Sequence, residues 1–461
     1  MKKLWLIGFI LCLLTSSAFG GMHDRFEQGG KATGLAGAYA AYANDVYAMY
    51  FNPAGLTQLK GPQFAVGVLF ANLHLEQRDF TVEKGGEIIA GPVDYEDSTD
   101  VLEDTSPAIG FGMPINDRIA AGILVNVPFG VRAAWNEKPS LTENPGAYNA
   151  FKSWHYRVAV TPTVAFKVNR KLSLGFGISI GYGVAGTYLH SYPMRELLTS
   201  LGGTGNVREE VEATDTSNYS FNFGLMYKIN KKLTFGLTYR GMSHMVFSGE
   251  LKLKNISPTD KAILAQLGIN KYKTDVNILG VHFPRQVQMG LRYAPNSRFS
   301  IEGDIVWTQW SINDTQIVEI KDPVFQRALG GSKIYSDRDW KDTTEWKIGV
   351  EWKATDILTL RAGYFYAPTA VPDHTYDMVW PDSDKNIYTI GAGIQLNKKW
   401  HIDGAIEYAT IEQDNRMVAG ESNNLNQSFM TGLVPGEPEA RVSVEEKGYF
   451  IAYSISVTYN F

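Results

Sequence analysis

The chain has 461 residues, a hydrophobic fraction of 44% and a formal net charge of -5. This length allows several domains or one large β-barrel, and the near balance of 43 basic and 48 acidic residues excludes a strongly basic nucleic-acid-binding protein. The single cysteine, Cys12, excludes a disulfide framework and, if an N-terminal leader is removed, thiolate chemistry as well.

The N-terminus has the features of a secretory signal peptide. Two lysines precede the apolar run Leu4–Leu14, and Ala18 and Gly20 occupy the small positions that a signal peptidase requires. The run is too short to span a membrane as a helix. We therefore expect a signal peptide at residues 1–20 with cleavage after Gly20.

Residues 21–60 are rich in Gly and Ala and lack the alternation of a strand. A segment of about forty residues cannot build a sound core alone, so it needs the surface of another domain. We expect a plug, or hatch, in the lumen of a barrel formed by residues 61–461. Glycines on the inward face of the strand at 172–184 would let another backbone approach closely. They are Gly175, Gly177, Gly181 and Gly183.

From residue 61 onward, apolar and polar residues alternate with the period of two that is typical of half-buried strands. The last strand is an example, because Tyr453, Ile455, Val457, Tyr459 and Phe461 alternate with small polar residues. No strand follows it. We expect its apolar face to contact lipid and its free edge to pair with the first strand, which closes a barrel.

The connections between strands fall into two classes. Six are short and polar, near residues 115, 168, 229, 294, 353 and 396, and they alternate with seven long ones. The long connections are 84–106, 132–154, 190–218, 249–283, 312–343, 367–386 and 413–444. This pattern predicts an all-β fold, a fourteen-stranded antiparallel transmembrane barrel with its short turns on the periplasmic side. A soluble sandwich or propeller is the alternative, but strands of ten or more residues ending in Tyr and Trp favour the barrel.

The third strand contains a predicted irregularity at Pro128, Phe129 and Gly130. Proline removes a ladder donor and glycine permits a bend, so a kink is one interpretation. The other is a plain strand end that runs into the outer loop.

Two short helices are predicted in the long connections, after Pro193 and from Ser257 to Gly268. Both carry apolar residues that need a partner. These residues are Leu197, Leu198, Leu201, Ile263, Leu264 and Leu267. The helices either pack on each other or form a surface groove that captures a hydrophobic ligand.

Enzyme and metal motifs are weak. The only match to a nucleophile elbow, around Ser179, lies within an alternating strand, and the histidines have no metal-ligand spacing. We therefore expect no enzymatic activity, no metal and no cofactor. Most inward charges are expected to form cross-strand pairs, and Arg361 with its neighbour Phe365 is a candidate contact for a ligand carboxylate.

The stretch "TGLAGAYAAYANDVYAMYFNPAGL" resembles the N-terminal hatch of the FadL family of outer-membrane transporters, which carry long-chain fatty acids or toluene-like hydrocarbons. The most specific element is the triplet Asn52, Pro53 and Ala54 ahead of the first strand. A second match, "PINDRIAAGILVNVPFG", is similar to the kinked third strand of the family. The resemblance covers the whole architecture, from signal peptide to terminal Phe461.

The resemblance implies a monomer in the outer membrane of a Gram-negative bacterium, surrounded by outer-membrane lipid and lipopolysaccharide. It implies passive uptake of a hydrophobic molecule, a long-chain fatty acid in the first instance. The ligand would be captured in the outer groove, pass to a luminal site and leave sideways at Pro128, Phe129 and Gly130. A channel for neutral aromatic hydrocarbons, a general porin, a structural barrel and an outer-membrane hydrolase remain as alternatives.

Overall fold

The structure is a computed structural model that describes residues 28–96, 105–329, 331–418, 424–431 and 436–461. The predicted signal peptide and the first residues of the predicted hatch, 21–27, lie outside the described residues. Within the described residues, no helix is long and apolar enough to cross a membrane.

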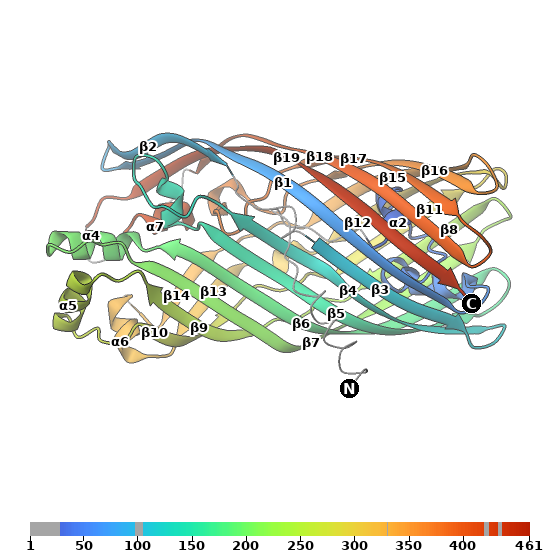
Figure 1. Ribbon diagram of the computed structural model, residues 1–461, viewed down its shortest axis with the longest axis horizontal. Coiled ribbons are helices and arrows are strands. Elements are labelled where there is room, and N and C mark those ends of the chain that lie inside the picture. The colour runs from blue at the N-terminus through green and yellow to red at the C-terminus, as the bar shows by residue number, and fades with distance from the viewer. Residues whose placement is uncertain (1–27, 97–104, 330, 419–423, 432–435) are drawn as a thin grey trace.

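The chain forms one closed antiparallel barrel, which confirms the predicted fold class (Figure 1). We call each of the fourteen positions around the barrel a stave. The last strand pairs with the first, from Gln63 opposite Asn460 to Lys84 opposite Ala440, so the barrel has no free edge at this seam. The staves are, in order, β1 (Gln63–Lys84), β3 (Thr105–Pro114), β4 (Ile119–Ala134), β5 (Lys152–Lys167), β6 (Leu172–His190), β7 (Arg208–Lys228), β8 (Leu233–Arg240), β11 (Gln286–Tyr293), β12 (Phe299–Thr308), β15 (Thr343–Lys353), β16 (Leu358–Ala367), β17 (Lys385–Gln395), β18 (Trp400–Val418) and β19 (Ala440–Asn460).

Five further strands continue staves toward the extracellular end: β2 (Glu87–Glu96), β9 (Phe247–Lys254), β10 (Lys273–Leu279), β13 (Thr315–Ile320) and β14 (Lys333–Asp337). Four neighbouring staves are therefore interrupted at mid-height. We call these interruptions the mid-height breaks: residues 241–246, 280–285, 309–314 and 338–342. They are pinned by hydrogen bonds between the staves, and Asn313, for example, accepts from the His282 amide at 2.6 Å and donates to its carbonyl at 3.0 Å.

The two faces of the wall follow the predicted alternation. In β19, Tyr453 and Ile455 are each 48% exposed, while Ser454 and Ser456 are buried toward the lumen. The strands extend beyond the predicted membrane part. Outward residues there are charged, as in the Lys252–Glu212 and Lys273–Glu250 ion pairs at 3.3 and 2.9 Å. The predicted long connections are therefore partly strand. Apolar outward residues identify a strand only where it faces lipid, so the alternation does not reveal the parts of strands that extend beyond the membrane.

The short turns share one local structure. Five contain an Asn whose side-chain oxygen accepts two backbone N–H groups, which closes an Asx turn. Asn169, for example, accepts from the amides of Lys171 and Leu172 at 2.8 and 3.0 Å. The five are Asn116, Asn169, Asn230, Asn296 and Asn397, and Thr355 makes the equivalent bonds in the sixth turn.

The helices are short. Three lie before the first strand and inside the barrel: α2 (Gly30–Thr33), α3 (Ala48–Phe51) and the 3₁₀ helix η1 (Pro53–Gln58). The others belong to the long connections: η3 (Pro145–Tyr148), α4 (Tyr192–Ser200), α5 (Pro258–Gln266), η4 (Trp310–Ile312), α6 (Pro323–Ala328), η5 (Asp373–Thr375) and α7 (Asn424–Ser428). In Figure 1, α4, α5 and α6 gather at the end opposite the C-terminus.

Candidate functional site

Residues 28–59, which we call the inner segment, fill the lumen near its short-turn end. Their apolar side chains form one buried cluster with inward residues of the wall such as Ala65, Leu124 and Met226. Small wall residues permit this close contact. The segment thus obtains from the barrel the core that it is too short to build alone.

Carboxylates of β12 hold the inner segment by its backbone. Asp304 Oδ2 accepts from the amides of Tyr39 and Ala40 at 3.1 and 3.0 Å, and Glu302 Oε1 accepts from the amide of Ala41 at 2.6 Å. All five residues are buried. Buried amides need acceptors, and these three bonds supply them, so this contact fixes the turn at residues 39–41 against the wall.

The triplet Asn52, Pro53 and Ala54 lies where the inner segment meets β6 and β7. The Asn52 amide donates to the carbonyls of Ala40 and Leu225 at 2.7 and 3.0 Å, and its oxygen accepts from the Ala54 amide at 3.1 Å. A Cβ atom at Gly175 would lie 2.3 Å from the Pro53 carbonyl carbon. Of the four predicted glycines, Gly175 faces the inner segment, whereas Gly177, Gly181 and Gly183 face side chains of the wall.

Arg361 also lies beside the inner segment, in a closed set of ion pairs. Its Nε contacts Glu351 at 2.8 Å and its Nη1 contacts Asp403 at 2.7 Å, and all three side chains are buried. The predicted neighbour Phe365 packs under the ammonium group of Lys347, 4.5 Å from the ring centroid. This geometry gives Arg361 two carboxylate partners from the protein, and its contact with a ligand stays a prediction.

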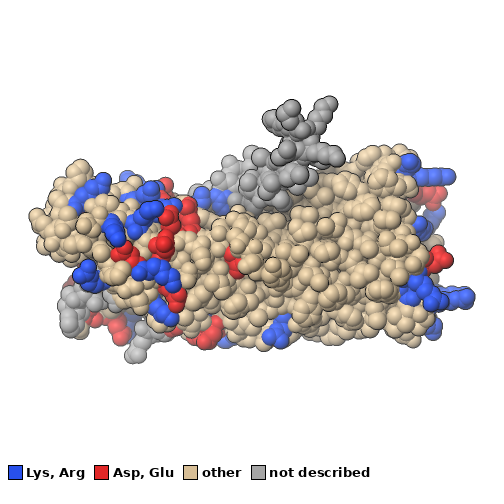
Figure 2. Space-filling model, turned by 90° about the horizontal axis from the view of Figure 1, so that it is seen from below, with Lys and Arg blue, Asp and Glu red and all other residues tan. Residues whose placement is uncertain are grey.

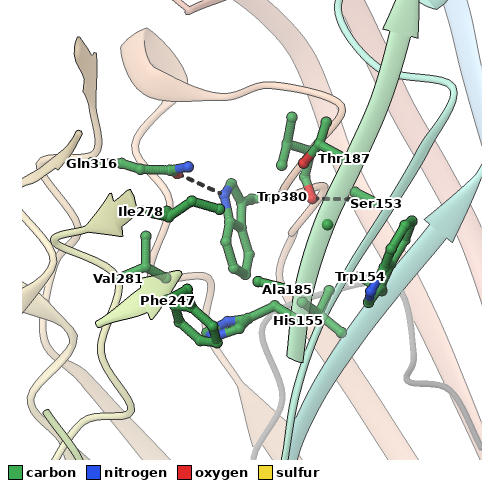
Figure 3. Close-up of a pocket in the computed structure, with 13 residues that line it drawn as sticks. Ser153, Trp154, His155, Ala185, Thr187, Phe247, Ile278, Val281, Gln316 and Trp380 are labelled. Carbon is green, nitrogen blue, oxygen red and sulfur yellow. Dashed lines mark hydrogen bonds between the residues drawn. The ribbon is translucent and has the colours of Figure 1, made fainter. Parts of the chain in front are cut away.

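Above the inner segment lies a second feature, an aromatic pocket made of two adjoining small cavities of about 20 Å³ each. They share Val131, His155, Val281 and Trp380. Figure 3 shows the first cavity, with Trp380 facing Ile278 and Val281 across it and His155 beside Phe247. The second cavity adds Phe129 and Gly130 of β4 and the rings of Phe283, Trp310 and Trp340.

The rings of the pocket are in contact with one another. Consecutive ring centroids lie 4.8 Å apart for Phe129 and Phe283, 4.6 Å for Phe283 and His155, 5.2 Å for His155 and Trp380, and 5.4 Å for Trp380 and Trp340. Three of the mid-height breaks supply pocket residues: Phe283, Trp310 and Trp340. The breaks therefore build the pocket. In a regular strand, alternate residues point to lipid, and the breaks release these segments from that alternation.

Polar groups in the pocket are few and uncharged. In the described part of the chain, its lining contains no Lys, Arg, Asp or Glu. Gln316 Oε1 is already an acceptor for Trp380 Nε1 at 3.4 Å and for Arg338 Nη2 at 2.6 Å. His155 Nε2, in contrast, is buried and has no hydrogen-bond partner among the described residues. Trp340 Nε1, in the second cavity, is likewise buried and has no hydrogen-bond partner among the described residues, so the pocket combines an apolar volume with two available polar atoms.

The wall beside the pocket is irregular at β4. Pairing between β3 and β4 ends at Ile109 opposite Val125, although β4 continues to Ala134. On its other side, the pairing with β5 shifts between Asn126 and Phe129, which is a bulge around Pro128. Within the described residues, the β3-facing edge of β4 is thus unpaired beyond Val125. The predicted kink is present, and its role as a gate stays a prediction.

The two predicted outer helices are present as α4 and α5, capped by the side chains of Ser191 and Ser257. Leu198 and Leu264 are fully buried in a shared cluster, so these two residues serve the packing of the helices on each other. Leu201 and Leu267 remain 52% and 48% exposed, while Leu197 and Ile263 are half-buried. A ligand groove at this surface stays a prediction.

The sequence did not point to the aromatic pocket. Trp340 and Trp380 fall in the predicted long connections 312–343 and 367–386, and Trp310 lies just before the first of them. Large aromatic residues in polar loops are a usable signal, because such side chains are seldom left in water. The partner of each ring comes from another stave, which a single sequence does not reveal.

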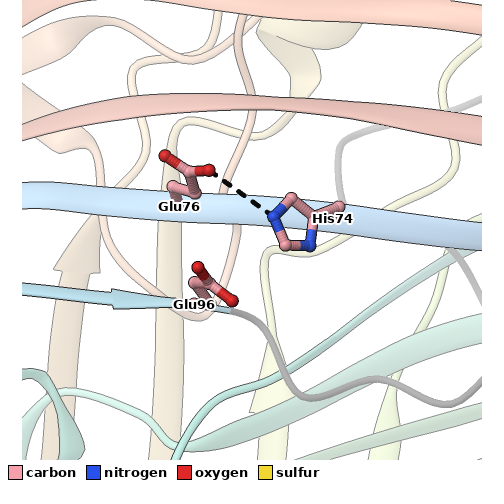
Figure 4. A group of neighbouring side chains, drawn as sticks. All are labelled: His74, Glu76 and Glu96. Carbon is pink, nitrogen blue, oxygen red and sulfur yellow. Dashed lines mark ion pairs between the residues drawn. The ribbon is translucent and has the colours of Figure 1, made fainter.

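A polar cluster lies on the outward face, where β1 leaves the apolar band. The ligand atoms of His74, Glu76 and Glu96 lie within 4.8 Å of one another (Figure 4). Glu76 also forms an ion pair with Arg78. The cluster faces away from the lumen, since His74 and Glu76 alternate with the buried residues of β1 and Glu96 is exposed at the end of β2.

The chain matches a protein family along almost its entire length. The profile described as "Outer membrane protein transport protein (OMPP1/FadL/TodX)" covers residues 12–461. A long-chain fatty acid transport protein of Escherichia coli is 22% identical over 402 residues, which are 82% of this chain and 84% of that protein. Outer membrane protein P1 of Haemophilus influenzae is 21% identical over 420 residues, covering 82% and 84% of the two chains.

Solved structures share the fold. A Pseudomonas aeruginosa FadL homologue superposes with a TM-score of 0.78 at 19% identity, covering 96% of this chain and 100% of that one. The toluene transporter TodX of Pseudomonas putida gives a TM-score of 0.63 at 19% identity, covering 95% and 99%. At these identities the similarity concerns the fold alone.

Proposed function

The chain belongs to the outer membrane protein transport protein family (OMPP1/FadL/TodX), and on that premise we propose that it takes up long-chain fatty acids. It is a transporter of hydrophobic molecules in the outer membrane of a Gram-negative bacterium, and not an enzyme. The observation that carries the proposal is the position of the aromatic pocket, which is lined on one side by Phe129 and Gly130 of the irregular strand β4.

The proposed route has three stages. The exposed leucines of α4 and α5 capture the ligand, the aromatic pocket binds its apolar part, and the ligand leaves sideways beside the unpaired edge of β4. The inner segment acts as the hatch that closes the lumen below the pocket. Lateral exit keeps an apolar molecule out of water, since the lipid side of β4 is apolar as well.

Within the pocket, we assign the polar end of the ligand to His155. Its Nε2 atom is buried without a partner among the described residues, so an N–H at this atom can donate to a carboxylate. A hydrogen bond to a charged group contributes about 1.5 to 3 kcal/mol. The uncharged lining favours a second candidate, a neutral aromatic hydrocarbon, which would use the rings and leave His155 without a partner.

Binding of a fluorescent long-chain fatty acid to the refolded protein tests this proposal. We expect displacement by oleate, and about tenfold weaker binding in His155→Phe, which keeps the ring stack but removes the polar atom. Leu69→Ala, in the wall of the lumen, is the matched packing control. Displacement by toluene with no effect of His155→Phe supports the hydrocarbon channel instead, and absence of any binding contradicts both.

A further inference from the structure

The two ends of the barrel differ in whether their Lys and Arg side chains form ion pairs. At the extracellular end, lysines on the outward face are paired with carboxylates of neighbouring staves, as in Lys252 with Glu212 and Lys333 with Glu319 at 3.3 and 3.1 Å. Figure 2 shows positive and negative side chains at both ends, and at the short-turn end the Lys and Arg side chains project farthest.

The six short turns carry eleven Lys or Arg and two Asp, although the whole chain has a net charge of -5. Every one of the eleven is exposed, and within the described residues none forms an ion pair. They are Arg118, Lys167, Arg170, Lys171, Lys228, Lys231, Lys232, Arg298, Lys353, Lys398 and Lys399. We call them the cationic rim.

The backbone of the turns fixes the places of these charges. In five turns the residue two positions after the capping Asn is Arg118, Lys171, Lys232, Arg298 or Lys399, and its amide donates to that Asn. One repeated turn structure therefore sets a cation at the same height on five pairs of staves. Summed over each turn, the charge is +3 at residues 167–171 and 228–232, +2 at 396–399 and +1 at 294–298, and it produces a positive potential over that part of the barrel end.

The same turns also carry exposed apolar side chains. These favour a lipid over a soluble partner, because they can enter the acyl layer. Ile115, Val168, Ile229, Ile357 and Leu396 are all exposed, each only a few residues from a cation. Lys399 in addition donates to the Tyr459 hydroxyl at 3.3 Å on the lipid-facing side of β19. Aromatic and apolar side chains that contact the acyl chains, next to Lys and Arg side chains that reach out to the phosphate groups, are typical of a membrane interface.

In one sector the rim also borders a hollow of about 650 Å³ under the end of the inner segment. This volume can accommodate a phosphorylated headgroup. Its charged lining consists of Lys60, Lys167, Arg170, Lys171, Lys228 and one acidic residue, Asp117.

We propose that the cationic rim is a binding surface for anionic phospholipids of the periplasmic leaflet. The short turns of an outer-membrane barrel face the periplasm, so the rim lies at the headgroups of that leaflet. Anionic headgroups supply the negative charge that the turns lack, and the apolar turn residues enter the acyl layer beside them. Uptake of a hydrophobic ligand does not depend on this surface.

The test is the thermal unfolding of the refolded mature protein in zwitterionic detergent with added phosphatidylglycerol or phosphatidylcholine. A ligand that binds the folded state raises the midpoint. We expect a larger rise with phosphatidylglycerol, a difference that 0.5 M salt reduces, since exposed charges are screened at that ionic strength. A rim variant should lose most of this difference. It combines Arg170→Gln, Lys171→Gln, Lys231→Gln, Lys232→Gln, Lys398→Gln and Lys399→Gln.

The matched control replaces six paired cations of the extracellular end and should keep the difference. It combines Arg208→Gln, Lys252→Gln, Lys271→Gln, Lys273→Gln, Lys321→Gln and Lys333→Gln. Loss in the control but not in the rim variant overturns the proposal. An equal rise with soluble polyglutamate overturns it too, in favour of an acidic periplasmic partner. If the rim variant does not fold, the wild type decides, because no lipid preference or no salt dependence contradicts a headgroup site.

Discussion

At the scale of single residues, Asp304 ties the inner segment to the wall most directly. One carboxylate oxygen accepts two backbone amides of the inner segment and the side-chain amide of Gln288, at 3.1, 3.0 and 2.7 Å. The residue is buried, so water cannot replace these bonds. The site is therefore sensitive to loss of this one acceptor.

We expect Asp304→Ala to loosen the inner segment while the barrel stays folded. Leaving a buried N–H without an acceptor costs about 1 to 3 kcal/mol. Hydrogen exchange of the Tyr39 and Ala40 amides should then be faster by about tenfold or more. Asp356→Ala, in an exposed turn at the rim, is the control. Unchanged exchange in Asp304→Ala would mean that packing alone holds the segment.

Arg361 shows what alternation predicts at this scale and what it does not. The period of two correctly predicted that Arg361 points into the lumen. Its partners lie 10 and 42 positions away in the sequence, Glu351 on the adjacent β15 and Asp403 on β18, beyond β17 on the other side. These side chains are close because of the register between the staves. The hydrophobic pattern alone does not determine that register to within one residue.

At the scale of elements, the pair α4 and α5 is joined by a polar contact as well as by leucines. Asp260 in α5 accepts from the Thr204 amide at 2.7 Å and from the Thr204 hydroxyl, just after α4. Burial by itself would raise the pKa of Asp260, but the hydrogen bonds from Thr204, Ser257 and Gly205 outweigh it and lower the pKa below its ordinary value.

A lowered pKa in the docked state means that acid weakens this contact. The contribution of Asp260 is present above its ordinary pKa of 3.8 and is lost as the pH falls through the lower value of the docked state. Spin labels at Leu201→Cys and Leu267→Cys, both exposed, should give a narrow distance distribution at neutral pH that broadens as the pH falls below 3.8.

Asp260→Asn should show the broad distribution already at neutral pH, since the amide cannot accept as strongly as a carboxylate. Asp117→Asn, at the opposite end of the barrel, is the control. A wild-type distribution that does not change in acid would contradict the role given to Asp260.

Element boundaries were predictable where lipid sets the pattern and not beyond it. The short turns lie where Asn and Lys interrupt the alternation, and the structure has them at those places. The mid-height breaks were missed, because Phe283 and Trp310 look like members of an ordinary strand or loop until their lumen partners are known. The aromatic pocket depends on those breaks, so it could not be derived from the sequence.

At the scale of the whole molecule, the lipid-facing band predicts a graded response to charge. Ile455 lies near the middle of the stretch of β19 between Tyr449 and Tyr459, whereas Val457 is two residues from Tyr459. The cost of an Arg is about 2 to 4 kcal/mol at the bilayer midplane and about 0 to 1 near an interface.

We therefore expect Ile455→Arg to lower the free energy of unfolding in lipid vesicles by more than Val457→Arg does. Ser456→Arg, which faces the lumen, separates the effect of lipid from that of crowding. Equal costs at Ile455 and Val457 would place the membrane differently along the barrel.

The central claim is that the ligand leaves the aromatic pocket sideways past β4. Uptake of a labelled long-chain fatty acid by cells that depend on this protein tests it most directly, with Gly130→Trp as the variant. Gly303→Trp, on the lipid face of β12 where a Cβ finds its nearest neighbour at 3.8 Å, is the control. We predict that Gly130→Trp folds and loses uptake, while Gly303→Trp retains it. Normal uptake by a folded Gly130→Trp barrel would contradict the lateral route.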